Sequence, residues 1–228
     1  MAVAVENASA KKARTHTIYR LQDGTRVPSV TTVLGVLNKP GLLKWAWELG
    51  VAGIEMDAYR DDLADVGRLA HQMIHAHLTG GDPDALCEGL ARDVVDRAQN
   101  SFLKFLHWQD QHDVQVILTE QPLVSETYRF GGTLDIYAYL DGRPVLIDLK
   151  TSKAIYDEFF LQLAAYRQLA TEHGYAVEGL RLLRIGRTET EGFEERVVSG
   201  PEMDSYWREF ECALRIYQIR AERRKGAA

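Results

Sequence analysis

The chain has 228 residues, of which 46% are hydrophobic and 26% charged, with a formal net charge of −6. This composition is ordinary for a globular protein that buries a substantial core. The negative charge argues against a protein that coats nucleic acid with a basic surface, but not against one that binds it through local basic patches or a metal-loaded cleft. Two cysteines, Cys87 and Cys212, are too few for a disulfide framework or a four-cysteine cluster.

Neither a membrane span nor a signal peptide is visible in the sequence. No apolar run approaches the ~18 residues that a span requires, and the first residues lack an apolar core. We therefore expect a cytoplasmic protein with reduced thiols and no membrane contact. Residues 1–15 lack periodicity and predict a flexible tail, and residues 16–225 predict a single domain. Two small basic clusters, at 11–14 and 220–225, are interpreted as solvated chain ends.

The first half of the chain predicts mainly helices. Residues 15–34 show strand-like alternation around an Asp-Gly pair. Three helical segments follow, at 41–56, from Asp61 to about Thr79, and from about Asp84 to Gln111. The sequence "GGDP" ends the second of these helices.

The second half predicts a run of strands. Four candidates, "VQVILTE", "LVSETYRF", "GTLDIYAYL" and "PVLIDLK", precede a helix at about Ala154–His173. Two further strands, "LRLLRIG" and "FEERVVS", precede a last helix at about Glu202–Arg224. This order indicates an α+β, or mixed α/β, fold with a central mixed sheet flanked by helices.

The stretch "GGTLDIYAYLDGRPVLIDLKTSK", residues 131–153, predicts a β-hairpin with an Asp-Gly turn. If the turn has two residues, Asp135 lies directly opposite Asp148 on one face of the sheet. A loop one residue longer would move Asp148 to the other face relative to Asp135. Pro144 adds a second condition, because proline favours a strand start or an edge.

The two carboxylates share their face with Lys150, because strand side chains alternate. Opposed carboxylates at a strand end offer the oxygen ligands that Mg²⁺ or Mn²⁺ prefers. Such a cation would polarise a phosphoryl oxygen and make water more acidic. Lys150 would stabilise developing negative charge or help to activate the water. The alternative is a pair of solvated strand-end aspartates with Lys150 as their counter-ion.

The segments "GGTLD", "LIDLKTSK" and "LQLAAYRQL" resemble, in this order, the motifs of the PD-(D/E)XK nuclease superfamily. The chain is most similar to the RecB-like and phage-type exonucleases, whose fold has a restriction-endonuclease-like core. A histidine in "GRLAH" and the segment "VPSVTTVL" before a Trp-containing helix also resemble members of this group. The resemblance covers roughly residues 28–170.

The resemblance implies a metal site. Asp135, Asp148 and His71 would bind the ion, with the Leu149 carbonyl as a further ligand. Glu120, at the end of the strand before the hairpin, corresponds to an additional acid of some members. We expect Mg²⁺ or Mn²⁺, and the histidine favours Mn²⁺. The chain has too few cysteines for the iron–sulfur cluster of some relatives, so no cluster is expected.

The resemblance also implies catalytic and substrate-binding residues. Lys150 would be the catalytic lysine. Gln162 and Tyr166, which share a helix face at i, i+4, would orient the lysine or the substrate phosphate, although the same pair also fits an ordinary helix face. Thr151 and Ser152 would contact phosphate or make a strand-end hydrogen bond.

Histidine and tryptophan pairs have competing interpretations. His71 and His75 are spaced as in the H-E-x-x-H motif of zinc proteases, but a glutamine replaces the glutamate that would act as general base. We therefore interpret His75 as a surface or packing residue. Trp45 and Trp47 would stack on single-stranded bases or pack in the core, and core packing is the favoured interpretation.

Three arginines, Arg181, Arg184 and Arg187, alternate with apolar residues in a predicted strand. This spacing fits a track for phosphate groups and equally fits the solvent-facing side of a sheet.

Together, the converging residues and the resemblance predict a metal-dependent DNA exonuclease of DNA repair, recombination or phage DNA processing. DNA is the expected partner, and a recombination protein such as a single-strand annealing protein is a second candidate. The expected location is the cytoplasm of a bacterial host or a phage-infected cell. The alternatives are a structure- or sequence-specific endonuclease of the same fold, and a non-catalytic nucleic-acid-binding or assembly protein.

Overall fold

A computed structural model of the chain describes residues 17–226, except for the side chain of Lys225. The predicted tail at 1–15 lies outside the described residues, and the single domain at 16–225 stays a prediction. The helices are α1 (Val30–Leu34), α2 (Pro40–Val51), α3 (Met56–Leu78), the 3₁₀ turn η1 (Asp84–Cys87), α4 (Arg92–Gln109), α5 (Asp157–Glu172) and α6 (Pro201–Gly226). The strands are β1 (Tyr19–Arg20), β2 (Arg26–Val27), β3 (Val114–Ser125), β4 (Phe130–Leu140), β5 (Arg143–Lys150), β6 (Gly179–Ile185) and β7 (Phe193–Val198).

A five-stranded mixed sheet forms the centre of the fold, with the strand order β3-β4-β5-β6-β7. Neighbouring strands are antiparallel except for β5 and β6, which are parallel and joined by α5. The short strands β1 and β2 form a separate antiparallel pair. The predicted α+β class with a central mixed sheet is confirmed.

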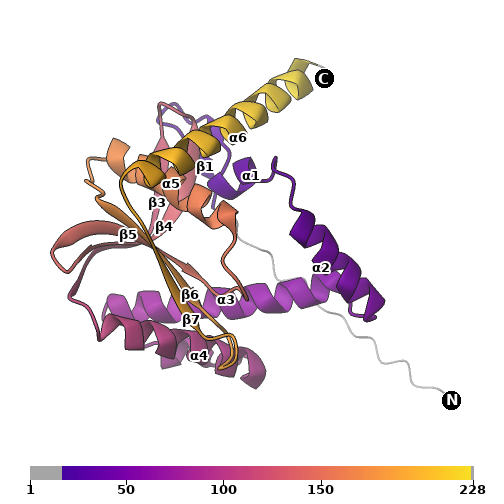
Figure 1. Cartoon of the computed structure of the whole chain (residues 1–228), viewed down its shortest axis with the longest axis vertical. Coiled ribbons are helices and arrows are strands. Elements are labelled where there is room, and N and C mark those ends of the chain that lie inside the picture. Colours follow the sequence, from indigo (N-terminus) through magenta and orange to yellow (C-terminus); the bar gives the residue numbers. More distant parts are fainter. Residues whose placement is uncertain (1–16, 227–228) are drawn as a thin grey trace.

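Helices cover both faces of the sheet (Figure 1). On one face, α1, α5 and α6 pack through a core that includes Phe130 and Leu146. On the other face, α3 and α4 contribute Ile74 and Phe105 to a second core. Because β5 lies in the middle of the sheet and is covered on both sides, its run "VLIDL" is buried throughout, as expected for a central strand. Asp148 is therefore a charged residue in an apolar run.

Two predicted strand segments differ from the structure. The segment "LVSETYRF" is not one strand: β3 continues to Ser125, the chain turns at 126–129, and β4 begins at Phe130. The Ser125 hydroxyl accepts a hydrogen bond from the Tyr128 amide at 2.8 Å, which favours this turn over a strand. In the described part of the segment at 15–34, the strands are β1 and β2, and Ser29 adds one isolated bridge to Gly131.

The residues after β2 form α1 instead of strand, because Ser29 caps the helix and accepts a hydrogen bond from the Thr32 amide at 3.0 Å. The predicted helix at 84–111 is also shorter than expected. It is divided into η1 and α4 by Gly89, whose φ of 73° breaks the helical path. Within residues 17–226, no helix is both long enough and apolar enough to cross a membrane.

Candidate functional site

The β4–β5 hairpin has the predicted two-residue turn. Leu140 pairs with Arg143, and Asp141 and Gly142 have φ values of 51° and 78°, as a type I′ turn requires. Pro144 is tolerated because the pairing of β5 with β6 begins only at the next residue. The register that brings Asp135 and Asp148 to the open end of the hairpin is therefore the expected one.

The pairing of β4 with β5 stops one position before the two aspartates. The last pair is Ile136 with Ile147, and the Leu149 amide donates a hydrogen bond to Asp135 Oδ2 at 2.8 Å. The Asp135 carboxylate thus accepts a hydrogen bond from an amide that, in a regular antiparallel ladder, would donate to a backbone carbonyl of β4. The register therefore aligns Asp135 with Asp148 as predicted, but the regular backbone pairing of the described strands ends one position before them.

Glu120 lies in the middle of β3, not at the end of a strand as predicted. Its φ is 48°, and the regular pairs Thr119–Ile136 and Gln121–Leu134 place it across from Asp135. A positive φ in a non-glycine residue is uncommon within a strand and marks local distortion. The distortion turns the Glu120 side chain toward the same place as Asp135.

His71 reaches this place from α3. Its Nδ1 atom lies 3.5 Å from Asp135 Oδ1 and 3.7 Å from Glu120 Oε1. The three side chains offer one ligand atom each, all within 4.8 Å of one another, which is a suitable arrangement for a metal ion. The approach of α3 depends on Gly67, since a Cβ atom there would lie 2.8 Å from the Thr151 hydroxyl oxygen.

The electrostatics of this group favour a positively charged occupant. Burial alone would lower the His71 pKa, but Asp135 and Glu120 outweigh burial and raise that pKa to about 10. Burial alone would raise the Asp135 pKa, but His71 and Lys150 lower it. In the absence of a metal ion, the single positive charge of the His71 imidazolium offsets only part of the negative charge of Asp135 and Glu120.

Asp148 lies beside Lys150 on the face of the sheet that α5 covers. Its side chain is 1% exposed, and Lys150 Nζ lies 2.5 Å from Oδ2. Among the described residues, neither Asp148 oxygen accepts a well-formed hydrogen bond. Burial raises the Asp148 pKa to about 6, although Lys150 opposes the shift. A buried carboxylate with so few partners is costly and therefore indicates a binding role.

The Lys150 ammonium group has a second contact that the sequence did not indicate. It lies over the ring of Phe159 in α5, 5.2 Å from the centroid, within cation–π range. The sequence pattern indicated no role for Phe159. The available signal was its position near the start of the helix that follows Lys150 in the chain.

Gln162 and Tyr166 of α5 interact as their spacing predicts. Gln162 Nε2 donates to the Tyr166 hydroxyl at 2.6 Å. Burial first, and then Asp148 and Asp135, raise the Tyr166 pKa well above its usual value, so this hydroxyl stays protonated near the two carboxylates. A Cβ atom on Gly132 would lie 2.5 Å from the Tyr166 ring, which explains why "GGTLD" has glycine there.

The residues after Lys150 form a loop instead of extending the strand. β5 ends at Lys150, and the Ser152 hydroxyl donates to the Ala154 carbonyl at 2.7 Å, within this loop. Thr151 faces Gly67 of α3. The Leu149 side chain is buried in the core below α3 and α4. Metal binding by the Leu149 carbonyl and phosphate contacts of Thr151 and Ser152 stay predictions.

The competing interpretations of the histidines and tryptophans have different outcomes. His75 Nδ1 lies 3.1 Å from the Thr119 hydroxyl and is not part of the metal-ligand group within the described residues. Packing of His75 against β3 agrees with its interpretation as a packing residue. Core packing of Trp47 is wrong, because its side chain is 68% exposed on α2. Trp45 is half-buried, and its ring contacts Tyr59.

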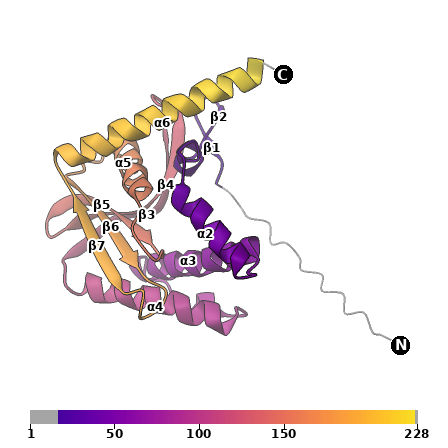
Figure 2. The ribbon, with the colours of Figure 1, turned by 45° about the vertical axis from the view of Figure 1, so that its right-hand side comes forward.

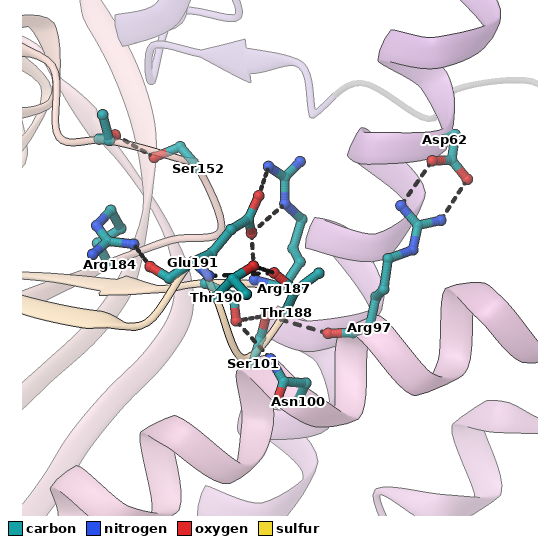
Figure 3. A network of polar contacts seen from close by, with 12 residues as sticks. Asp62, Arg97, Asn100, Ser101, Ser152, Arg184, Arg187, Thr188, Thr190 and Glu191 are labelled. Atoms are coloured by element: carbon teal, nitrogen blue, oxygen red, sulfur yellow. Dashed lines mark hydrogen bonds and ion pairs between the residues drawn. The ribbon is translucent and has the colours of Figure 1, made fainter.

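Neither interpretation of the three arginines matches the structure. Arg184 and Arg187 are buried and paired with Glu194 and Glu191, and Arg181 pairs with Glu195. Figure 3 shows Arg187 and Glu191 facing each other beside the Asp62–Arg97 ion pair. Arg184 and Arg187 hold the β6–β7 connection in place, whereas Arg181 is partly exposed and pairs across the two strands.

A scan against protein-family models and a search of curated proteins found no match to this chain. Among solved structures, the chain is similar to LHK-Exo, an alkaline exonuclease from Laribacter hongkongensis, with a TM-score of 0.33 and 11% identity over 71% of this chain and 91% of that chain. The same exonuclease in complex with dAMP gives a TM-score of 0.32 and 13% identity, with the same shares covered, 71% and 91%.

The structure of SSO0001 is similar with a TM-score of 0.30 and 14% identity, over 66% of this chain and 74% of that chain. All of these similarity values are low. The function of this chain is therefore inferred from the side chains at the open end of the β4–β5 hairpin.

Proposed function

We propose that this chain is a divalent-metal-dependent deoxyribonuclease, and more specifically an exonuclease. The observation that carries this proposal is the position of Asp148. It is buried beside Lys150, accepts no well-formed hydrogen bond from a described residue, and adjoins the group formed by His71, Glu120 and Asp135. A buried carboxylate that has only the Lys150 ammonium beside it among the described residues is costly, and a divalent cation is the further partner that this donor set suits.

The side chains present fit a divalent cation. His71, Glu120 and Asp135 offer ligand atoms within 4.8 Å of one another, and Asp148 adds a carboxylate with an unused oxygen. One nitrogen with several oxygen donors suits Mn²⁺ or Mg²⁺, with the nitrogen favouring Mn²⁺. When bound, the cation would supply a Lewis acid that offsets phosphate charge and makes water more acidic.

Lys150 is the residue that we assign to charge stabilisation during hydrolysis. Its ammonium group is held between Asp148 Oδ2 and the Phe159 ring. A fixed ammonium at the attacked phosphate stabilises the negative charge that develops there, and a preformed position avoids reorganisation during the reaction. Tyr166, kept protonated by its raised pKa, and its partner Gln162 would donate hydrogen bonds to the same phosphate or hold Asp148 in place.

Exonuclease action, DNA as the substrate, and a role in DNA repair, recombination or phage DNA processing belong to this proposal. The order of the sequence motifs supports them, because they resemble those of the RecB-like and phage-type exonucleases. A recombination protein such as a single-strand annealing protein is the protein partner that this role suggests.

The proposal is tested by incubating the wild type and Lys150→Ala with linear and circular DNA in Mn²⁺, Mg²⁺ or EDTA. We expect linear DNA to be degraded only with metal, and the variant to lose about 10²–10³-fold in rate, the usual cost of a removed charge-stabilising group. Lys153→Ala is the matched control, because it removes an exposed lysine from the loop just after β5 and leaves the Asp148 contact intact.

Other outcomes separate the alternatives. Cutting of circular DNA by the wild type, lost in Lys150→Ala, identifies an endonuclease. DNA binding without cleavage in any metal contradicts the nuclease proposal and favours a non-catalytic binding protein.

A further inference from the structure

The last helix, α6, carries an uneven distribution of charge. Four of its five acidic residues lie in its first half, and five of its six basic residues lie from Arg215 onward. The helix macrodipole favours cations in a last turn, but Arg220 lies six residues before the end at Gly226, beyond that turn. The macrodipole therefore accounts for only part of this basic cluster.

Three of these cations face a hollow between α6 and α1. Arg220, Arg223 and Arg224 have the i, i+3, i+4 spacing that places side chains on one helix face. With Tyr217, they line a hollow of about 660 Å³ whose other wall is Thr32 of α1 and the two residues that follow this helix, Gly35 and Val36. Figures 1 and 2 both show the C-terminal end of α6 running past α1. We call Arg220, Arg223 and Arg224 the α6 arginine surface.

Within the described residues, the α6 arginine surface has no carboxylate partner. All three side chains are exposed, and no ion pair joins any of them to a carboxylate within residues 17–226. Arg97 and Arg187, in contrast, are each paired with a carboxylate. Arg224 Nε donates to the Arg220 carbonyl at 3.2 Å, which leaves its positive charge uncompensated. In a chain with a net charge of −6, a cluster of guanidinium groups without carboxylate partners among the described residues is suited to an anion from outside the molecule.

A second hollow adjoins the first. It has a volume of about 550 Å³, shares Thr32 with the first hollow, and is also lined by Tyr19 and Arg26. The Tyr19 hydroxyl lies 2.8 Å from the hydroxyl of Thr133, two residues before Asp135 in β4. The two hollows therefore lie in succession from the strand that carries Asp135 to the end of α6.

We propose that the α6 arginine surface binds the phosphate backbone of a single DNA strand, away from the carboxylates where cleavage would occur. Guanidinium groups suit phosphate geometry. The apolar side chain of Val36 and the ring of Tyr217 offer contact area to unstacked bases, as in other single-strand sites. This inference rests on the proposed function, because it assigns the surface to the same substrate.

The test measures DNA binding in EDTA, where no cleavage occurs, with a labelled single-stranded oligonucleotide and the duplex of the same sequence. The variant is Arg220→Ala, Arg223→Ala, Arg224→Ala, and the matched control is Arg208→Ala, Arg215→Ala, which removes exposed cations from the same helix outside the hollow. We expect the triple variant to raise the Kd for the single strand by about tenfold or more, and to lower its log–log salt slope by about 2, since each phosphate contact contributes ~0.7.

The control should bind like the wild type, and all variants should keep the wild-type Tm because the changed side chains are exposed. Equal binding of the single strand by the triple variant and the control overturns the proposal. So does a loss confined to the duplex, or a loss confined to vesicles of anionic lipid. If the wild type binds the single strand through these arginines but cleaves no DNA in any metal, the proposed function fails while the surface assignment holds.

Discussion

Two aspartates of the same hairpin lie in opposite environments. At the turn, Asp141 is exposed and its carboxylate accepts hydrogen bonds from His112 and from the Asp113 amide, both at 2.9 Å. These bonds lower its pKa. At the open end, Asp148 is buried, accepts no well-formed hydrogen bond from a described residue, and has a pKa raised to about 6, chiefly by burial.

The difference separates a structural role from a functional one. The Asp141 carboxylate satisfies donors that the turn would otherwise leave unpaired, so it stabilises the fold. The Asp148 carboxylate loses hydration and gains only Lys150 in return, so it costs stability in the absence of a ligand. Residues that oppose the stability of their own fold are expected at binding and catalytic sites.

The largest expected effect is that of Asp148→Asn. Activity should fall by about 10²–10⁴-fold, because a carboxylate that positions the metal ion and lysine is lost. At about pH 8, the metal-free variant should be more stable than the wild type by about 1–3 kcal/mol, since the pKa of Asp148 lies about two units above its ordinary value. Nuclease assays and urea unfolding measure the two effects.

If the two aspartates have opposite roles, Asp141→Asn should have the opposite effect to Asp148→Asn. Its activity should stay within about twofold of the wild type, while its stability should fall, because an amide is a weaker acceptor for His112. If both variants change stability in the same direction, the contrast between the two aspartates is wrong.

A second effect is the pH dependence of the metal-free protein. The folded state holds protons that the unfolded chain releases, between pH 3.8 and about 6 on Asp148 and between pH 6.5 and about 10 on His71. For each residue, the resulting stability is fully present below the ordinary pKa, which is that of the unfolded chain. It is lost as the pH rises through the raised pKa of the folded state. A bound cation would replace both protons. Saturating Mn²⁺ should therefore raise the Tm more at about pH 8 than at about pH 5, as measured by calorimetry.

The histidine is the residue to vary in this experiment. His71→Ala should remove the loss of stability between pH 6.5 and about 10, whereas His107→Ala, which changes an exposed histidine of α4, should keep it. Equal Mn²⁺-induced shifts at the two pH values would count against metal binding at His71 and Asp148.

The smallest expected effect concerns the position of Lys150. Phe159→Leu removes the aromatic face below the ammonium group, and a cation–π contact of about 0.5–2 kcal/mol corresponds to a loss of about 2–30-fold in kcat. Phe159→Tyr keeps the face and should keep kcat. A change in KM alone, or an equal loss in both variants, would show that the ring does not position the lysine.

The turn end of the hairpin could be predicted from the sequence, and the open end only in part. An Asp-Gly pair fixes the turn type and hence the register, so Asp135, Asp148 and Lys150 were correctly expected together. The sequence pattern did not indicate that the Leu149 amide would bond to the Asp135 side chain. A side chain that competes with the backbone for an amide donor leaves no periodic pattern in the sequence.

Glu120 shows a further limit of sequence patterns. It was expected at a strand end, yet it lies within β3 at a positive φ, where it joins His71 and Asp135. Alternation of apolar and polar residues reports which face a side chain occupies in a regular strand, and it fails where the strand is distorted. The exposed Trp47 shows the same limit. A large aromatic side chain predicts burial, but the sequence does not show whether another element packs against it.

The glycine pair of β4 has a consequence for how the molecule opens. Gly132 leaves space for the ring of Tyr166 from α5, and Gly131 leaves space for the ring of Tyr19 from the β1–β2 ribbon. The α5 side belongs to the main core, whereas β1 and β2 have two residues each. Undocking of so short a ribbon requires less free energy than global unfolding. We therefore expect the side of β4 next to the ribbon to be uncovered at a lower free energy than the side next to α5.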